Sequence, residues 1–412
     1  MIKTTDLILP ASGTMQKSRT SLFLLSFMST LFGGIVSSLM SIYLADVAKE
    51  LLQNTDSQVN DNISATINAI SIFGWTLGGI TWGIFSDSIG RRKAFIYATL
   101  CYGLATILTG LSPNWMFVVL FRFISGFGIG GVLVITTMLI SESYDEKRRA
   151  VLLGILSIAI PVGFFSAGLI TYFVTNWRWA FMVGTIPVIF SILAAISIRE
   201  SEKWKRAKIE ESKITSRFTE LFSGLNMKNL MIGSAVFGAP LIGLWATVSW
   251  LPLWIHHLDT GGDALRAGAL AMMLVGAGGL TGGFISGWIV NAIGIRNTLL
   301  ICFGASFLLS LILFKLTRQL SSTTYIQIAF LSLFFGMSQG ALSIFIPELF
   351  PTSLSATATG VCFNLGRIFT GLAVFFIGAL VDTLGGYGNS IFYFSFVFII
   401  AFFVTLFSSV KK

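Results

Sequence analysis

Apolar runs of about twenty residues recur from one end of the 412-residue chain to the other. Each run is long enough to cross a hydrocarbon core of roughly 30 Å as a helix that rises about 1.5 Å per residue. The runs lack the period-two alternation of membrane strands, which argues against a β-barrel. Charged residues make up only 11% of the chain, against about one-quarter in soluble proteins. The sequence therefore predicts an all-α, polytopic membrane protein.

Twelve runs are predicted as transmembrane helices, with approximate ranges 20–44, 66–86, 93–112, 115–140, 150–175, 179–198, 229–255, 266–289, 298–316, 324–346, 356–381 and 389–409. The first is too long for the apolar part of a signal peptide and no small-residue cleavage site follows it, so we expect it to be retained. One long polar stretch divides the helices six and six. We therefore expect an N-terminal six-helix bundle at 1–198, a cytoplasmic linker at 199–228 and a C-terminal six-helix bundle at 229–412.

Basic residues are distributed unevenly over the loops. If both termini are cytoplasmic, most of the 27 Lys and Arg residues fall in cytoplasmic segments, as the positive-inside rule requires. Membrane insertion and contact with anionic lipid then account for the net charge of +9, without nucleic acid as a partner. The short loops favour a bacterial inner membrane, and we expect a multi-pass monomer. Three scattered Cys and two adjacent His predict no disulfide and no metal site, and no nucleotide-binding motif or other cofactor pattern is present.

The two halves of the chain repeat one another. GIFSDSIGRR at 83–92 follows the second predicted helix, and GWIVNAIGIR at 287–296 follows the eighth. A second match places Glu142 and Glu348 at equivalent positions after the fourth and tenth helices, where we expect both to belong to gates. Duplicated six-helix halves are typical of transporters that give alternating access to a site between the halves.

The first of these repeated loops has residues suited to a reversible contact. Gly83 lies on a small-residue face that lets helices approach closely, and Gly90 permits a tight reversal. Asp87 can pair with Arg91 or Arg92, or it can face a helix N-terminus in the other half. Such contacts break at little cost, which favours a latch formed in one state only. The alternative is that the arginines only satisfy the positive-inside rule.

Three motifs carry a resemblance to a known family. GIFSDSIGRRK at 83–93 resembles the signature G-x-x-x-D-x-x-G-R-[RK] of the major facilitator superfamily. Arg122 and Gly126 are similar to its second motif, and PELFP at 347–351 is similar to a tract of its sugar and organic-acid branches. The resemblance covers essentially the whole chain. It implies the major facilitator fold, with two pseudo-symmetric six-helix bundles, and secondary active transport by alternating access.

Motifs of individual branches narrow the resemblance. The antiporter signature is absent from the fifth helix, which disfavours drug efflux, and the sugar-porter pair of Gln residues is absent from the seventh. Trp250-Leu-Pro252 in the seventh helix resembles instead the aromatic-acid and metabolite–proton symporter branch. That branch carries an Asp-rich first helix, whereas this chain has only Asp46, at the outer end of its first helix. Coupling to H⁺ is therefore an open question.

Two arginines, Arg122 and Arg367, lie deep within predicted helices, and no carboxylate lies at mid-depth to pair with them. An arginine keeps its proton, so its counter-charge must come from elsewhere, and a substrate carboxylate would supply it in a planar, two-bond fit. For Arg122 a structural or coupling role is favoured over substrate contact. Arg367 and Asn364 share one face of the eleventh helix, which is expected to point inward. The alternative for Arg367 is a hydrogen bond to a carbonyl of a neighbouring helix.

Aromatic and amide side chains complete the candidate site. Trp245 and Gln339 join Arg367, Asn364 and Arg122 as predicted substrate-binding residues, and Trp75 is a weaker candidate. The predicted function is secondary active transport of a small organic solute, an organic anion with a carboxylate, with H⁺ as a candidate coupling ion. The alternatives are a sugar or neutral-metabolite porter and, less favoured, drug efflux. No catalytic residue is predicted, because no nucleophile, metal or acid–base group stands out.

Overall fold

The computed structural model describes residues 12–52, 57–201, 204–205, 222, 224–259, 263–350 and 355–407. Within these ranges, twelve helical segments are long and apolar enough to cross a membrane, so the predicted spans are confirmed. The predicted linker at 199–228 lies mostly outside the described residues.

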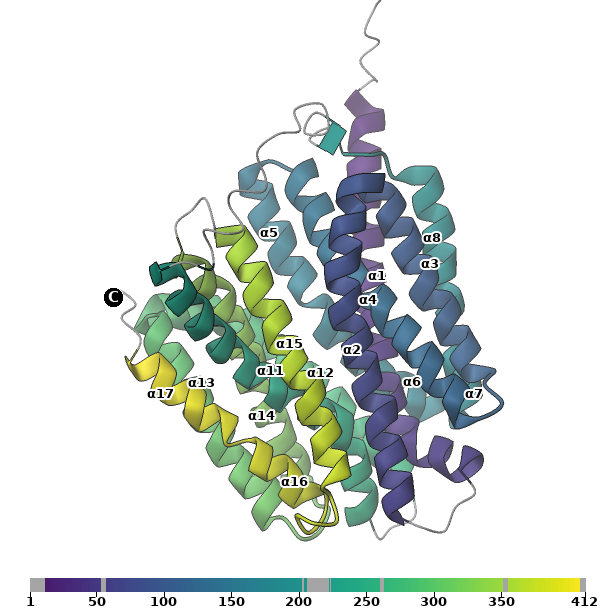
Figure 1. The fold of residues 1–412 in the computed structure, drawn as a ribbon, viewed down its shortest axis with the longest axis vertical. Coiled ribbons are helices and arrows are strands. Elements are labelled where there is room, and N and C mark those ends of the chain that lie inside the picture. Colours follow the sequence, from purple (N-terminus) through teal and green to yellow (C-terminus); the bar gives the residue numbers. More distant parts are fainter. Residues whose placement is uncertain are drawn as a thin grey trace, which may run out of the picture.

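Helices of the N-terminal part form a first group: α1 (Ser12–Leu51), α2 (Ser57–Ile89), α3 (Arg91–Gly110), α4 (Trp115–Ser143), α5 (Glu146–Ser157), α6 (Ala159–Phe173), α7 (Trp177–Phe181), the 3₁₀ turn η1 (Met182–Gly184) and α8 (Thr185–Ser197). The second group is α11 (Gly224–Leu258), α12 (Ala264–Ile293), α13 (Ile295–Ser310), the π-helical turn η2 (Leu311–Leu316), α14 (Ser322–Glu348), α15 (Ser355–Ala379), α16 (Tyr387–Phe394) and α17 (Val397–Phe407). The first group lies on the right in Figure 1 and the second on the left. They meet where α2 packs on α15, α6 on α12, and α1 on α11.

The fifth span is interrupted between α5 and α6, at Ile158. Pro161 lies three residues beyond this point and has no backbone N–H to donate to the carbonyl of Ser157. At the same place the Ile158 N–H donates to the Ile155 carbonyl, at 3.3 Å, which is the tighter spacing of a turn. One proline therefore divides this span into two shorter helices.

The two ends of the molecule are distinguished by their charged residues. The end at which α3 and α5 begin, at the top of Figure 1, is here called the basic end. Arg91, Arg92 and Arg149 lie in the first turns of these two helices. The opposite end, which carries Glu50 and Arg178, is called the far end. There the Glu50 carboxylate accepts hydrogen bonds from the Arg178 Nε, at 2.9 Å, and from the Trp177 indole, at 2.6 Å. These bonds join the end of α1 to α7.

The two repeated loops at the basic end have the same construction. Gly90 and Gly294 take φ angles of +101° and +82°, which glycine adopts without steric penalty. Two residues later, Arg92 donates to the Ala195 carbonyl of α8, and Arg296 donates to the Leu406 carbonyl of α17. Each arginine thus ties the third span of its group to the last span of the same group.

The interface of α6 and α12 is closed from the far end to mid-depth. Gly168 packs on Met273, and Gly276 packs on the backbone of Phe165 so closely that a Cβ would have no room. The residue numbers of the contacts decrease along α6 as they increase along α12, because the two helices are antiparallel. The last of them joins Gly279 to Pro161.

The interface of α2 and α15 is closed over the same depth. Gly378 packs on Ala65 at the far end, and Gly371 packs on Phe73. The series ends where a Cβ on Gly79 would lie 3.3 Å from the Asn364 Oδ1 atom. Both interfaces therefore hold the groups together from the far end to the middle of the molecule.

Towards the basic end the two groups lie apart. Gly154 of α5, Gly287 of α12 and Gly360 of α15 are exposed, and no described atom lies within 4 Å of the place where a Cβ would be. Gly83 of α2 meets only Val134 of its own group, at 3.8 Å. The molecule is therefore closed at the far end and open between the groups at the basic end.

Candidate functional site

Five side chains from four helices meet where the closed part of the interface ends. They are Arg367 and Asn364 of α15, Trp245 of α11, Trp75 of α2 and Phe164 of α6, and are called the central cluster below. The Arg367 Cζ lies 5.8 Å from the centroid of the Trp75 ring, and its Nη1 donates to the Asn364 Oδ1 at 3.3 Å. The Trp245 ring lies edge-on to Trp75 and to Phe164, with centroids 5.2 and 5.9 Å apart. The cluster therefore draws residues from both groups.

Close helix packing fixes the position of Trp75. A Cβ on Gly130 of α4 would collide with the Trp75 carbonyl oxygen, and a Cβ on Gly126 would lie 3.1 Å from the Trp75 nitrogen. Two glycines one turn apart on α4 thus let α2 approach until backbone meets backbone. The Trp75 ring is consequently held at the interface by the packing of its own group, and only 6% of its surface is exposed.

The cluster carries a positive charge and an unused hydrogen-bond donor. Arg367 is partly exposed, and no carboxylate among the described residues forms an ion pair with it. The Trp75 indole N–H is buried without a hydrogen-bond partner. A guanidinium, an unpaired N–H and the rings of two tryptophans suit an anion with a flat or apolar body.

Arg122 is placed differently from Arg367. It is 1% exposed, and its guanidinium donates to two carbonyls of α1, from Nη1 to Val36 at 2.8 Å and from Nη2 to Ser37 at 3.3 Å. Among the described residues, no hydrogen bond, ion pair or cation–π contact joins it to the central cluster. In this geometry Arg122 ties α4 to α1, and the structural or coupling role that the sequence analysis favoured stays a prediction.

Gln339 lies on α14, and its Nε2 is buried without a hydrogen-bond partner. No hydrogen bond in the described residues connects it to the central cluster. Of the five predicted substrate-binding residues, the structure thus brings together Arg367, Asn364 and Trp245. It adds Phe164, which no sequence pattern singled out, and Trp75, which was the weaker candidate.

The predicted latch residues form contacts within the first group. Arg91 pairs with Asp87, and its Nε donates to the Glu142 carboxylate at 3.1 Å. Two residues that the sequence analysis assigned to the linker join them. The Glu200 carboxylate accepts from the Arg92 backbone N–H at 3.0 Å, and the Trp204 indole donates to the Asp87 carbonyl at 2.8 Å.

Glu348, the counterpart of Glu142 in the second group, is exposed at the end of α14 and has no ion pair among the described residues. The repeat explains the difference, because the position equivalent to Arg91 is occupied by Ile295. The two groups therefore share the backbone construction of this loop, but only the first group has its ion pairs.

We expect Asp87→Asn to slow transport several-fold while expression and membrane insertion stay normal. The Asp87 side chain is two-thirds exposed, so its ion pair contributes at most about 1 kcal/mol to stability. Its loss leaves Arg91 paired with Glu142 alone and changes the balance between states rather than the packing. Initial rates at saturating substrate would measure the effect, with Asp145→Asn, in the α4–α5 loop, as the control. Unchanged rates would speak against a role for Asp87 in the transport cycle.

Comparison with known proteins agrees with this architecture. A family model described as Major Facilitator Superfamily matches residues 21–373. The chain is 25% identical over 375 residues to the cis,cis-muconate transport protein of Acinetobacter baylyi, with 87% of each chain covered. It is 27% identical over 361 residues to the sialic acid transporter NanX of Escherichia coli, which covers 86% of this chain and 85% of that one. The solved structure of a D-xylose–proton symporter shares the fold, with a TM-score of 0.77 at 17% identity over 94% of this chain and 97% of the other.

Proposed function

Because the chain belongs to the Major Facilitator Superfamily and is a membrane transporter rather than an enzyme, we propose that it moves a small organic carboxylate by alternating access. The resemblance noted in the sequence motifs is thereby confirmed at the level of family and fold. The identity of the substrate class rests on the site itself.

The observation that carries the proposal is Arg367. It lies at the interface of the two groups, at the depth where the opening from the basic end stops, and lacks a carboxylate partner among the described residues. A guanidinium in such a place is costly to leave uncompensated, and intramembrane charges mark substrate or ion pathways. A substrate carboxylate would accept two parallel N–H bonds from it.

The tryptophans of the central cluster favour a substrate with a planar part. Trp245 is 8% exposed, and its ring lies across the interface from Trp75. An unsaturated or aromatic acid could place its carboxylate on Arg367 and its flat body against these rings, with the Trp75 N–H as a further donor. Relatives named for the transport of muconate and sialic acid support an acid over a neutral sugar.

We further propose that the basic end faces the cytoplasm of a bacterium and that the protein resides in the inner membrane. The excess of Lys and Arg at that end supports this orientation. On this assignment the structure represents an inward-open state, with the central cluster accessible from the cytoplasm.

A ligand screen by thermal unfolding would test the substrate class. Purified protein is heated with planar monocarboxylates, with the matching neutral amides, and with neutral sugars. A ligand present at 100 times its Kd stabilises the folded state by about 2.7 kcal/mol. We expect the acids to raise the melting temperature and the amides and sugars to leave it unchanged. A shift with sugars and none with acids would overturn the proposal in favour of a neutral-solute porter.

A further inference from the structure

A buried hydrogen bond joins the two groups close to the central cluster. The Nδ2 atom of Asn68, on α2, donates to the backbone carbonyl of Ser249, on α11, at 3.1 Å. The two residues are only 4% and 3% exposed. A buried amide needs a hydrogen-bond partner, and Asn68 takes this one from the other group. The bond therefore exists only while the two groups are in contact at this depth.

The bond lies just beyond the central cluster, on the side of the far end. Ser249 is one turn along α11 from Trp245, and Asn68 is two turns along α2 from Trp75, so each pair shares one face of its helix. The two helices are antiparallel, and the contact of Trp75 with Trp245 is followed by that of Asn68 with Ser249. The same strip of interface therefore holds the two tryptophans and, nearer the far end, the hydrogen bond.

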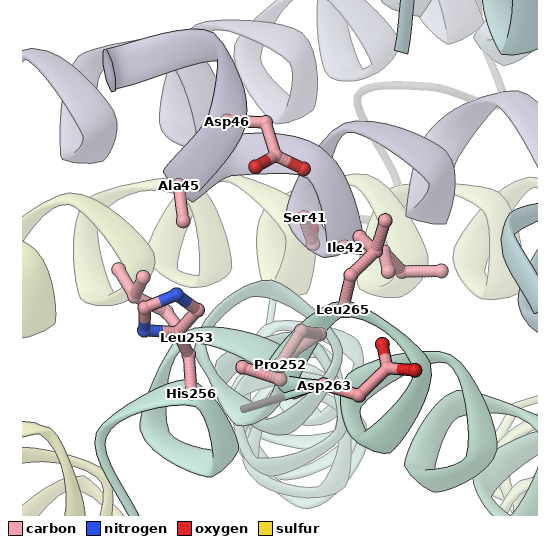
Figure 2. Close-up of a pocket in the computed structure, with 10 residues that line it drawn as sticks. Ser41, Ile42, Ala45, Asp46, Pro252, Leu253, His256, Asp263 and Leu265 are labelled. Carbon is pink, nitrogen blue, oxygen red and sulfur yellow. The ribbon is translucent and has the colours of Figure 1, made fainter. Parts of the chain in front are cut away.

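Farther along, a cavity of about 220 Å³ lies between α1 of the first group and α11 and α12 of the second. Ser41 and Asp46 line it from α1, and Leu253 lines it from α11 (Figure 2). Leu253 is one turn beyond Ser249, so Ser249 lies midway between Trp245 and the cavity lining, about 6 Å of helix from each. In depth, the hydrogen bond therefore lies between the central cluster and the cavity.

A second polar contact between the groups is exposed to solvent. The Arg266 guanidinium, on α12, lies over the ring of Tyr172, on α6, with its Cζ 5.5 Å from the ring centroid. The Arg266 side chain is 52% exposed and also pairs with Asp263. Water screens such a contact, so little is lost there when the far end opens. The buried bond of Asn68 is the polar contact whose loss matters more.

We propose that the Asn68–Ser249 hydrogen bond is a gate contact, which separates the central cluster from the far-end cavity and breaks when the far end opens. In the open state, water solvates the Asn68 amide in place of the carbonyl. One neutral hydrogen bond is thereby exchanged for another, so the contact shifts the balance between the two states by only several-fold. A contact of this size favours closure and still lets the far end open in every cycle. The inference rests on the alternating access proposed above, but not on the substrate being a carboxylate.

Two substitutions remove the bond without adding a large apolar side chain, whose burial would itself favour closure. Asn68→Ser shortens the side chain by one bond, and the serine hydroxyl can donate to a carbonyl of α2 instead. Asn68→Ala removes the polar group altogether.

The matched control is Thr76→Val, on the same helix. Thr76 is also 4% exposed, but its hydroxyl donates within α2, to the Ile72 carbonyl at 3.0 Å. This bond does not depend on the other group, so its loss should not change the balance between open and closed states.

The experiment needs no substrate. Spin labels are attached at two exposed far-end positions, Met116 of the first group and Leu316 of the second, which are 63% and 62% exposed. The protein lacks its three native cysteines and is held in lipid nanodiscs. Distances between the labels are measured by pulsed electron spin resonance in the wild-type background and in each variant.

We expect Asn68→Ser and Asn68→Ala each to raise the population of the longer, far-end-open distance about fivefold relative to the closed one, which is the effect of one hydrogen bond between neutral groups. Thr76→Val should leave this ratio unchanged. If one of the Asn68 variants does not fold, as judged by its melting temperature, the other decides.

A wild-type distance distribution in the Asn68 variants would overturn the inference, because Asn68 would then only satisfy its own amide. An equal shift in Thr76→Val would overturn it too, since the loss of any buried hydrogen bond in α2 would then loosen the far end. No ligand is added, so none of these results bears on the carboxylate proposal, which the ligand screen tests separately.

Discussion

Arg367→Gln abolishes the binding of carboxylates, whereas Arg367→Lys retains weak binding: this is the largest effect we expect of a single substitution. Without the guanidinium, a substrate carboxylate is desolvated and unpaired, at a cost of roughly 2–5 kcal/mol. Lysine restores the charge but not the planar pair of donors. Binding is measured by isothermal calorimetry with an acid found in the ligand screen and with its neutral amide.

The amide distinguishes charge recognition from a structural role. It should bind wild-type protein more weakly than the acid does and lose little further affinity in Arg367→Gln. Arg318→Gln, which removes an exposed arginine at the far end, serves as the matched control and should leave both affinities unchanged. If acid and amide weaken equally and the melting temperature falls, Arg367 supports a neighbouring helix and does not recognise the substrate.

Bulky side chains at the open glycines should stop turnover without unfolding the protein. The antiparallel pairing of α6 with α12 ends at Pro161 and Gly279. If it is extended by two turns, it places Gly154 opposite Gly287. One turn beyond the last contact of α2 with α15, the pairing of those two helices places Gly83 opposite Gly360. If the basic end closes during transport, these two pairs become the points of closest approach.

We therefore expect Gly287→Leu and Gly360→Leu to bind substrate normally and to transport it roughly ten to a hundred times more slowly. In the structure both positions are open, so stability is retained, but overpacking in the closed state costs about 1–3 kcal/mol. Uptake into proteoliposomes and thermal unfolding measure the two quantities. Gly304→Ala, whose Cβ would meet only Phe402 of its own group at 3.9 Å, is the control. Normal turnover in both leucine variants would show that the basic end does not close along this register.

Hydropathy was sufficient to predict the twelve spans, whereas the major facilitator fold was implied by the resemblance of the motifs. The twelve predicted spans agree with those of the structure to within a few residues at most ends, because a lipid bilayer sets the length of each apolar helix. The largest difference concerns the first span, which continues to Leu51 and so places Asp46 within a helix rather than beyond its end.

The site was predicted only in part, because the sequence gives depth but not neighbours. Arg122 and Arg367 were indistinguishable by depth, and only tertiary contacts show one bound to α1 carbonyls and the other on Trp75. The pairing of Trp75 with Trp245 joins residues 170 positions apart on different helices. Helical periodicity assigned each to a face of its own helix, but it could not show that the two faces meet.

The interruption of the fifth span at Ile158 has a mechanical consequence for closure of the basic end. A continuous helix resists bending, so Gly154 could reach Gly287 only if the whole first group rotated. Because Pro161 has no N–H to donate to the Ser157 carbonyl, the helix lacks a backbone hydrogen bond at this point. The short helix α5 can therefore change its angle to α6 at Ile158. The basic end of this span can therefore swing inward over two turns of helix while α6 keeps its contacts with α12, which makes closure on this side a local bend added to the movement of the groups.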